Sequence, residues 1–393
     1  MVHGARLAKS MNTGPCMGLT IIMKMRECTK YLLSLLLGTA CTLGAAAQDT
    51  PAKQRLGQQA LDDLKQQTTF GGYVIGEASL SNQEGSSKHS DMNIRLVRLY
   101  VDGRVLDVAY KLQLQVNGMP GGSSGPRIVD AWAEWQHWKE FRLKFGQMKR
   151  GFTFENPMHP WKIGFGAYSQ LVTKLAGFSD RVGEHASNGR DFGLQAQGDL
   201  FPSRRDGHRW LHYQVGVFNG QGTNVSDANS HKDVIGGLWI APVPELQIGA
   251  FGWTGNFVKD GITVDRNRYG FGLNYTGDKV MVRSEFAVSE GHKTADYFDA
   301  DGKQLASPTG TDGADAWYVA LGAPVAPRTK VWGKWDVYRD AKTWGTARQM
   351  YCVSAEHRFH PNVMLQANYV FNDDHLAADR YYHSLDVQLY WRF

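Results

Sequence analysis

The segment Tyr381–Phe393 reads YYHSLDVQLYWRF, and its side chains alternate between two kinds. Successive side chains of a β-strand point to opposite faces. One face of this predicted strand is therefore apolar, with Leu385, Val387, Leu389, Trp391 and Phe393, whereas Asp386, Gln388 and Arg392 lie on the other. Such an apolar face must be covered, either by the second layer of a soluble sandwich or by lipid.

Three internal segments repeat this pattern. They are DVAYKLQLQVN at 107–117, KVMVRSEFAV at 279–288 and VMLQANYVF at 363–371. A tilted strand of about ten residues can cross a bilayer, and apolar residues outside with polar residues inside are typical of an outer-membrane barrel. These segments favour lipid over a second protein layer.

The links between the segments alternate in length, as expected for a barrel with tight turns at one end and long loops at the other. The predicted strands are 72–80, 93–103, 106–117, 128–138, 141–150, 190–199, 210–219, 233–241, 245–254, 266–276, 279–289, 315–322, 328–339, 347–359, 362–371 and 383–393. The sequence thus predicts an all-β fold, a transmembrane antiparallel β-barrel of about 16 strands over residues 70–393. Its last strand would pair with its first, so that the apolar face meets lipid.

Residues 25–47 have the features of a signal peptide. Arg26 and Lys30 precede an apolar run, and three alanines precede Gln48. Residues 1–24 would then be a misassigned upstream segment, and residues 48–69, polar and rich in Gln, a short periplasmic extension. Lipid attachment at Cys41 is the alternative. Only Cys352 lies beyond this leader, so no intrachain disulfide is expected in the mature chain.

The charge balance argues against a nucleic-acid partner. After residue 47 the chain has 38 basic and 37 acidic residues, and a near-neutral chain has no field to gather phosphates. No run of 18 apolar residues follows the leader either, so no transmembrane helix is expected.

The link at 151–189 is the longest, and it is too aromatic for a free surface loop. We expect it to enter the barrel lumen and narrow the pore. Basic residues in or near this link are the candidates for a pore constriction that binds anions: Arg142, Lys144, Lys149, Arg150, Lys162, Lys174, Arg181 and Arg190. Pairing of such charges with acids on neighbouring strands is the competing interpretation.

Four motifs resemble the phosphate-selective porin O and P family in its Bacteroidetes-type form. They are MNIRLVRLYVDGRV at 92–105, FGQMKRGFTFEN at 145–156, GRDFGLQAQGDLF at 189–201 and YQVGVFNGQG at 213–222. The resemblance implies a sixteen-stranded, usually trimeric porin with a basic constriction for phosphate or other small anions. Trp391 and Phe393 fit the C-terminal signal for outer-membrane insertion.

The predicted function is therefore passive conduction of small hydrophilic solutes across the bacterial outer membrane. Lipid, lipopolysaccharide and the barrel assembly machinery are the expected partners, and no catalytic residue, cofactor or metal site is expected. His208 with His212, and Asp299–Gly302, are weak metal-site patterns. An adhesin with an occluded barrel is the alternative function, and an outer-membrane hydrolase is a third.

The signal-peptide interpretation predicts the mature N-terminus. Amino-terminal sequencing of protein purified from outer membranes should begin at about Gln48, because cleavage follows the small residues of the leader. A distinctly different start would contradict this assignment.

The loop interpretation predicts the effect of a deletion. Removing Trp161–Ala176 should raise single-channel conductance in planar bilayers, because it removes bulk from the lumen. An unchanged conductance would place this loop outside the pore.

Overall fold

A computed structural model describes residues 51–84, 89–118 and 125–393. The predicted signal peptide and upstream segment lie outside the described residues. The chain divides into two units at Gln59 and Ala60, and the second unit contains the barrel. Within the predicted extension, helix α2 spans Pro51–Gln67. No helix among the described residues is both long and apolar enough to span a membrane.

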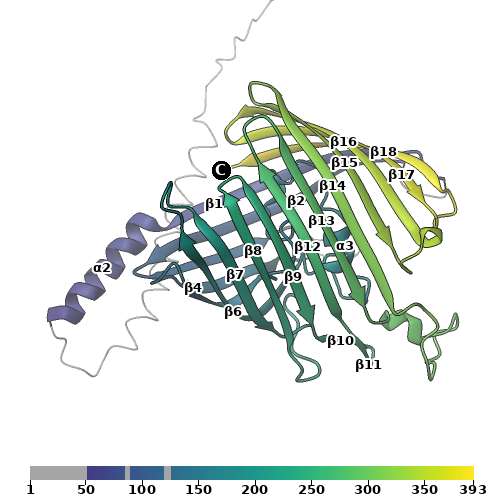
Figure 1. Cartoon of the computed structure of the whole chain (residues 1–393), viewed down its shortest axis with the longest axis horizontal. Coiled ribbons are helices and arrows are strands. Elements are labelled where there is room, and N and C mark those ends of the chain that lie inside the picture. The colour runs from purple at the N-terminus through teal and green to yellow at the C-terminus, as the bar shows by residue number, and fades with distance from the viewer. Residues whose placement is uncertain (1–50, 85–88, 119–124) are drawn as a thin grey trace, which may run out of the picture. The chain divides into compact units, whose positions relative to one another are not determined.

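Within the described residues, sixteen antiparallel strands close into one barrel, which confirms the predicted fold class (Figure 1). The strands are β1 (Thr69–Ser81), β2 (Ser90–Val105), β3 (Val108–Gln115), β4 (Arg127–Trp135), β5 (Arg142–Lys149), β6 (Arg190–Pro202), β7 (Arg209–Phe218), β8 (Asp233–Val243), β9 (Leu246–Thr254), β12 (Asn267–Thr276), β13 (Met281–Glu290), β14 (Gly313–Ala326), β15 (Thr329–Arg339), β16 (Ala347–His360), β17 (Val363–Asp374) and β18 (Tyr381–Arg392).

Strand β18 closes the barrel against β1. Gly72 and Phe393 exchange two backbone hydrogen bonds, of 2.9 and 3.0 Å. A Cβ at residue 72 would lie 2.6 Å from the Phe393 ring, so the close approach of the last side chain requires glycine there. The alternation is as predicted: Trp391 is 52% exposed on the outer face, whereas Tyr390 is 1% exposed on the inner face.

One short hairpin was not predicted. Strands β10 (Asn256–Lys259) and β11 (Ile262–Asp265) pair in the link between β9 and β12. Asp260 and Gly261 both have positive φ, of 52° and 78°. An Asp-Gly pair with positive φ at both residues is typical of a tight hairpin turn. This dipeptide is therefore the sequence feature from which the hairpin could have been predicted. The four-residue strands are too short for a membrane-spanning pattern.

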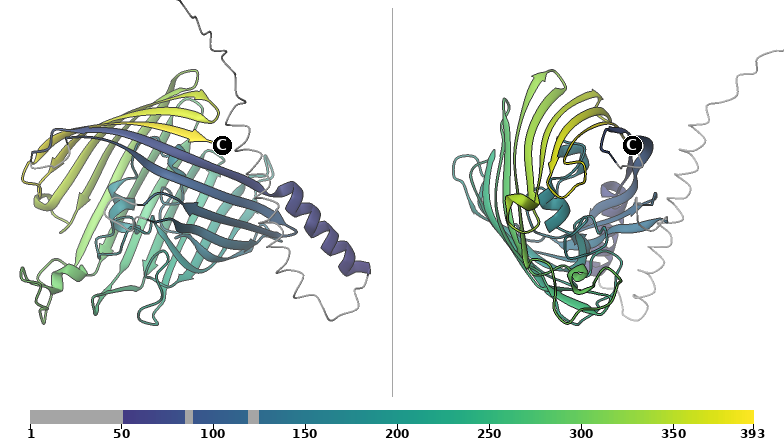
Figure 2. Two further views of the ribbon diagram at one scale, coloured as in Figure 1. Left: turned by 180° about the vertical axis from the view of Figure 1, so that it is seen from behind. Right: turned by 90° about the vertical axis from the view of Figure 1, so that its right-hand side faces the viewer.

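The link between β5 and β6, residues 150–189 and called L3 below, lies inside the ring of strands (Figure 2). It contains the 3₁₀ helix η1 (Pro160–Lys162) and helix α3 (Gln170–Leu175). Its Phe152, Leu171 and Leu175 are fully buried against wall residues such as Ile235 and Trp253. The aromatic content of this link is thus accommodated by packing on the barrel wall.

Carboxylates and an amide of the wall hold L3 in place. Glu285 of β13 accepts hydrogen bonds from the backbone N–H groups of Phe154 (2.6 Å) and Glu155 (2.9 Å). Asp336 of β15 accepts from the N–H of Gln170 at 3.1 Å. Asn368 of β17 accepts from Gly166 at 2.9 Å. These bonds satisfy backbone groups that would otherwise be buried without partners.

The remaining links contain two more 3₁₀ helices, η2 (Thr294–Tyr297) after β13 and η3 (Trp344–Thr346) before β16. Val182 of L3 packs in a small cluster with Phe257, Ile262 and Val264 of the β10–β11 hairpin. The far end of L3 is therefore held by a neighbouring loop as well as by the wall.

Candidate functional site

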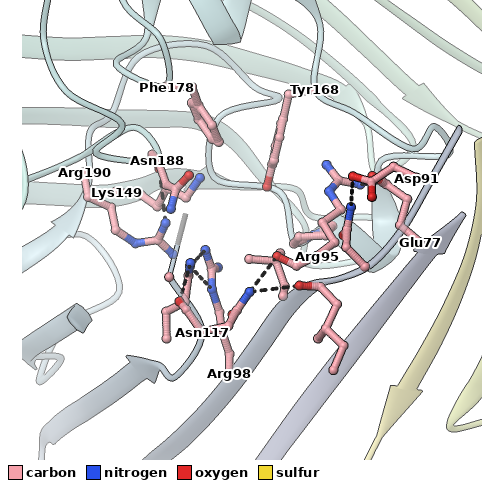
Figure 3. A pocket seen from close by; sticks show the side chains of 16 residues that line it. Glu77, Asp91, Arg95, Arg98, Asn117, Lys149, Tyr168, Phe178, Asn188 and Arg190 are labelled. Carbon is pink, nitrogen blue, oxygen red and sulfur yellow. Dashed lines mark hydrogen bonds and ion pairs between the residues drawn. The ribbon is translucent and has the colours of Figure 1, made fainter. Parts of the chain in front are cut away.

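The wall side chains that accept from the L3 backbone in the bonds above lie on β13, β15 and β17, and a cavity of about 650 Å³ is lined by residues of β1, β2, β3, β5 and β6 (Figure 3). Strand residues and L3 residues line it together. Arg98, Gln115 and Lys149 come from the wall, and Tyr168 and Phe178 come from L3. The cavity is therefore the space between the loop and the first strands of the barrel.

Arg98, Lys149 and Arg190 line this cavity, and Arg127 reaches Asn188 of its lining; these four residues are called the basic cluster below. Arg190 forms a two-pronged ion pair with Asp130, at 2.8 and 3.0 Å. With its amide oriented to satisfy both arginines, Asn188 accepts from Arg98 at 3.3 Å and from Arg127 at 2.7 Å. Among the described residues, Asp130 is the one carboxylate within 4.0 Å of the charged nitrogens of Arg98, Lys149 and Arg190, and it pairs with Arg190, so these three cations carry an excess of positive charge.

Neutral groups solvate two of these cations. Arg98 donates to the Tyr73 hydroxyl at 3.0 Å and to the side-chain amide oxygen of Gln115 at 3.1 Å. Lys149 donates to the Asn156 backbone carbonyl at 2.7 Å. In the described part of the chain, no carboxylate oxygen lies within 4.0 Å of the charged nitrogens of Arg98 or Lys149. Their charges are therefore available to an anion in the cavity.

A β-bulge adds Arg95 to the basic residues that line the cavity. In the pairing of β1 with β2, Ile75 lies opposite Leu96 but Gly76 lies opposite Ile94, so Arg95 is the extra residue. Arg95 lines the cavity and approaches Glu77 at 3.7 Å. Strict alternation would place Arg95 and Arg98 on opposite faces, and the bulge brings both into the lumen.

Further basic residues lie on the wall beyond the basic cluster, on β3 and β5. Lys111 pairs with Asp102 at 2.9 Å, and Arg142 pairs with Asp199 at 2.8 Å. The ammonium of Lys144 lies 3.7 Å from the centre of the Trp132 ring. The candidates Arg142 and Lys144 thus lie on the same side of the barrel as the cavity, and Arg142 is neutralised by its neighbour.

Six of the eight candidate residues lie outside the cavity lining: Arg142 and Lys144 on the wall, and four residues of L3. Arg150 is fully buried, and Arg181 is 6% exposed and bonded to the backbone of Gly291. Lys174 lies over the Tyr338 ring at 6.0 Å, and Lys162 is exposed beside the Trp161 that packs on the wall. The structure thus places these four candidates outside the cavity, and the loop uses Arg150 and Arg181 to anchor itself. Lys149 and Arg190 are the candidates that the cavity brings together.

Arg150 belongs to a buried ion network between L3 and the wall. It donates to Glu184 at 3.0 Å and to Asp191 at 3.0 Å, and Arg266 joins the same Glu184 at 2.5 Å. Both guanidinium groups lie over the Trp253 ring, at 4.8 and 4.6 Å. Burial alone lowers the pKa of Arg150, but Glu184 and Asp191 outweigh it and hold this pKa above its ordinary value. The network is an anchor rather than a solute site.

The two histidines of the weak metal-site pattern have hydrogen-bond partners within the protein. His208 is bonded to Asp206 and Ala241, and His212 is bonded to Asp199 and stacked on Trp239 at 3.9 Å. Within the described ranges, no three His, Cys, Asp or Glu side chains are grouped to hold a metal ion.

The fold is similar to that of solved outer-membrane porins. An anion-selective porin from Comamonas acidovorans matches with a TM-score of 0.61 at 13% identity, covering 83% of this chain and 99% of that chain. OmpF of Salmonella typhi, solved with daunomycin, matches at 0.62 and 11%, covering 83% and 97%. OmpT of Vibrio cholerae in its trimer form matches at 0.56 and 12%, covering 83% and 99%. The comparison with curated proteins found no match.

The closed sixteen-stranded barrel, with a loop folded into its lumen beside a charged cavity, defines the class: this protein is a porin of the bacterial outer membrane. The family model described as phosphate-selective porin O and P matches residues 71–246. This match over part of the chain bears out the resemblance seen in its sequence.

The ion network predicts the effect of Glu184→Ala. Removing this carboxylate leaves two buried guanidinium groups with fewer partners, which should lower the free energy of unfolding by about 3–5 kcal/mol. Urea unfolding in lipid vesicles, followed by tryptophan fluorescence, measures the change.

Glu140→Ala is the matched control, because Glu140 pairs with Arg209 at the surface with its side chain 51% exposed. An exposed pair contributes about 0–1 kcal/mol. Equal losses in the two variants would contradict the anchoring role of the network.

Proposed function

We propose that this porin favours anions, phosphate among them, which pass between L3 and the wall formed by β1–β5. The observation that carries the proposal is the basic cluster, whose cavity-lining members Arg98, Lys149 and Arg190 have among the described residues one carboxylate within 4.0 Å, that of Asp130, paired with Arg190. A positive cluster in a narrow polar passage lowers the barrier for anions and raises it for cations.

The donor set suits oxyanions in particular. Guanidinium groups present planar pairs of N–H donors that match phosphate and carboxylate oxygens, and an ammonium adds a point charge. Within the described residues, Arg98 and Lys149 bond to neutral groups and form no ion pair, so an arriving anion does not need to break one to reach them. Such a site is suited to transit as well as to binding.

L3 gives the passage its width and acts as its constriction. The loop is bonded to the wall at Glu285, Asp336 and Asn368, so its distance from the basic cluster is fixed by the barrel itself. A fixed separation allows selection by size as well as by charge.

The assembly that we propose is a homotrimer in a bilayer with lipopolysaccharide. One of the similar porins, OmpT of Vibrio cholerae, has been solved in a trimer form. Trp391 and Phe393, exposed on the lipid side at the closing strand, suit recognition by the barrel assembly machinery. The fold and family point to a channel rather than an enzyme.

The reversal potential across a potassium chloride gradient tests the anion preference. We expect the sign of an anion-selective channel, and we expect added phosphate to reduce the chloride current. In the double variant Arg98→Gln and Lys149→Gln, the reversal potential should move toward zero. The inhibition constant for phosphate should rise about tenfold or more, because hydrogen bonds to charged groups contribute roughly 1.5–3 kcal/mol each.

Lys303→Gln is the control. Lys303 is exposed on the link after β13, so this substitution removes a positive charge at a position away from the cavity. A wild-type channel without anion preference would overturn the proposal. A protein that inserts but conducts no ions would favour the alternative of an occluded barrel that displays its loops.

A further inference from the structure

The cavity beside the basic cluster has an aromatic side that transport of inorganic ions does not use. Tyr168 and Phe178 project from L3 toward the same space that Arg98 and Arg190 face from the wall (Figure 3). Both rings are half-buried, and their centres lie 4.6 Å apart with planes inclined by 45°.

The loop holds these rings in fixed positions. The Tyr168 hydroxyl donates to the Met158 backbone carbonyl at 2.6 Å, and the ring therefore cannot turn away without losing that bond. Phe178 follows α3 closely, and the two rings pack against the buried cluster of L3 and the wall. The aromatic surface is thus built before any ligand arrives, which reduces the entropy cost of binding.

Lys149 lies close to both the basic side and the aromatic side of the cavity. The Lys149 ammonium lies 4.6 Å from the centre of the Phe178 ring and 5.1 Å from that of Tyr168. The ammonium also donates to the backbone carbonyl oxygen of Asn156 at 2.7 Å, which holds it in place. A negatively charged group bound at Lys149 would therefore place whatever is attached to it beside the aromatic pair.

The size and lining of the cavity argue for an organic anion. Its volume of about 650 Å³ lies within the range of roughly 300–1,000 Å³ that is typical of pockets for organic ligands. Leu96 and Pro160 add apolar surface to that of Tyr168 and Phe178. A tetrahedral inorganic anion would use the charged side alone and leave this apolar surface in contact with water.

The acidic residues that line the cavity, Glu77 and Asp91, do not lie where the negative group of such a ligand would bind. Glu77 approaches Arg95 at 3.7 Å and accepts from Gln388 at 2.6 Å. Asp91 accepts from Asn93 at 3.2 Å. These acids lie on the side of the cavity away from Arg190 and Lys149 in Figure 3, so the negative end of a ligand has one favoured side.

We propose that this cavity is a binding site for aromatic carboxylates, with the carboxylate at the basic cluster and the ring against Tyr168 and Phe178. The proposal rests on the proposed anion preference and names a substrate class for the same passage. Ring packing of this kind contributes about 0.5–1.5 kcal/mol beyond area burial, so an aromatic acid should bind about tenfold more tightly than an aliphatic acid of similar charge.

The test uses the full-length mature porin in planar bilayers, with benzoate and acetate as probes. Each is added to a chloride solution, and the inhibition constant is obtained from the reduction in chloride current. We expect an inhibition constant about tenfold lower for benzoate than for acetate. Equal constants for the two acids overturn the proposal, and this comparison requires no variant.

The variant Phe178→Leu tests the ring itself while retaining an apolar side chain. Its inhibition constant for benzoate should rise several-fold, with a smaller change for acetate. Phe359→Leu is the matched control, because Phe359 is 58% exposed on β16, outside the cavity lining. A Phe178→Leu channel that keeps the wild-type ratio of benzoate to acetate affinity overturns the assignment of the ring.

The chloride reversal potential of the same channels separates this inference from the proposed function. Anion selectivity with equal affinity for benzoate and acetate means that the aromatic site is wrong and the anion preference stands. A channel without anion selectivity means that the proposed function has failed, and the aromatic-carboxylate proposal falls with it. Heat-modifiable migration on gels confirms that each variant has folded as a barrel.

Discussion

Backbone hydrogen bonding in lipid is the constraint on which the rest of this structure depends. Every N–H and C=O group inside the bilayer must pair within the protein, so a sheet that spans the membrane cannot have an open edge. The pairing of β1 with β18, including the bonds between Gly72 and Phe393, meets this requirement. Closure also creates the lumen, and the lumen makes it possible for L3 to bury its aromatic side chains inside the barrel instead of at its surface.

The lumen then imposes a second constraint, because charges that enter it must be solvated by the protein. The barrel solvates its basic side chains in two ways. Arg150 and Arg266 are fully buried and share Glu184, which fixes L3 to the wall. Arg98 and Lys149 are solvated by neutral groups and face the cavity. Basic residues of the lumen therefore either hold L3 through buried ion pairs or face the cavity with neutral partners.

The wall could be predicted from the sequence because its signal is local. A strand that faces lipid on one side and water on the other alternates at every residue, and this alternation is visible in Leu389, Tyr390 and Trp391 without any tertiary information. The site was less predictable, because basic residues in a loop do not reveal their partners. Arg181 and Arg190 are nine positions apart in sequence, but one bonds to the Gly291 backbone and the other faces the cavity beside Asp130.

The sequence alone determined the barrel, its strand number and the aromatic character of L3, because the membrane requires a repeating pattern that single residues express directly. Tertiary structure alone decided which cations face the passage. The bulge at Arg95 breaks the alternation, and the fold of L3 brings Tyr168 and Phe178 to the basic cluster. Both depend on contacts between segments far apart in the chain, and such contacts leave no periodic trace in the sequence.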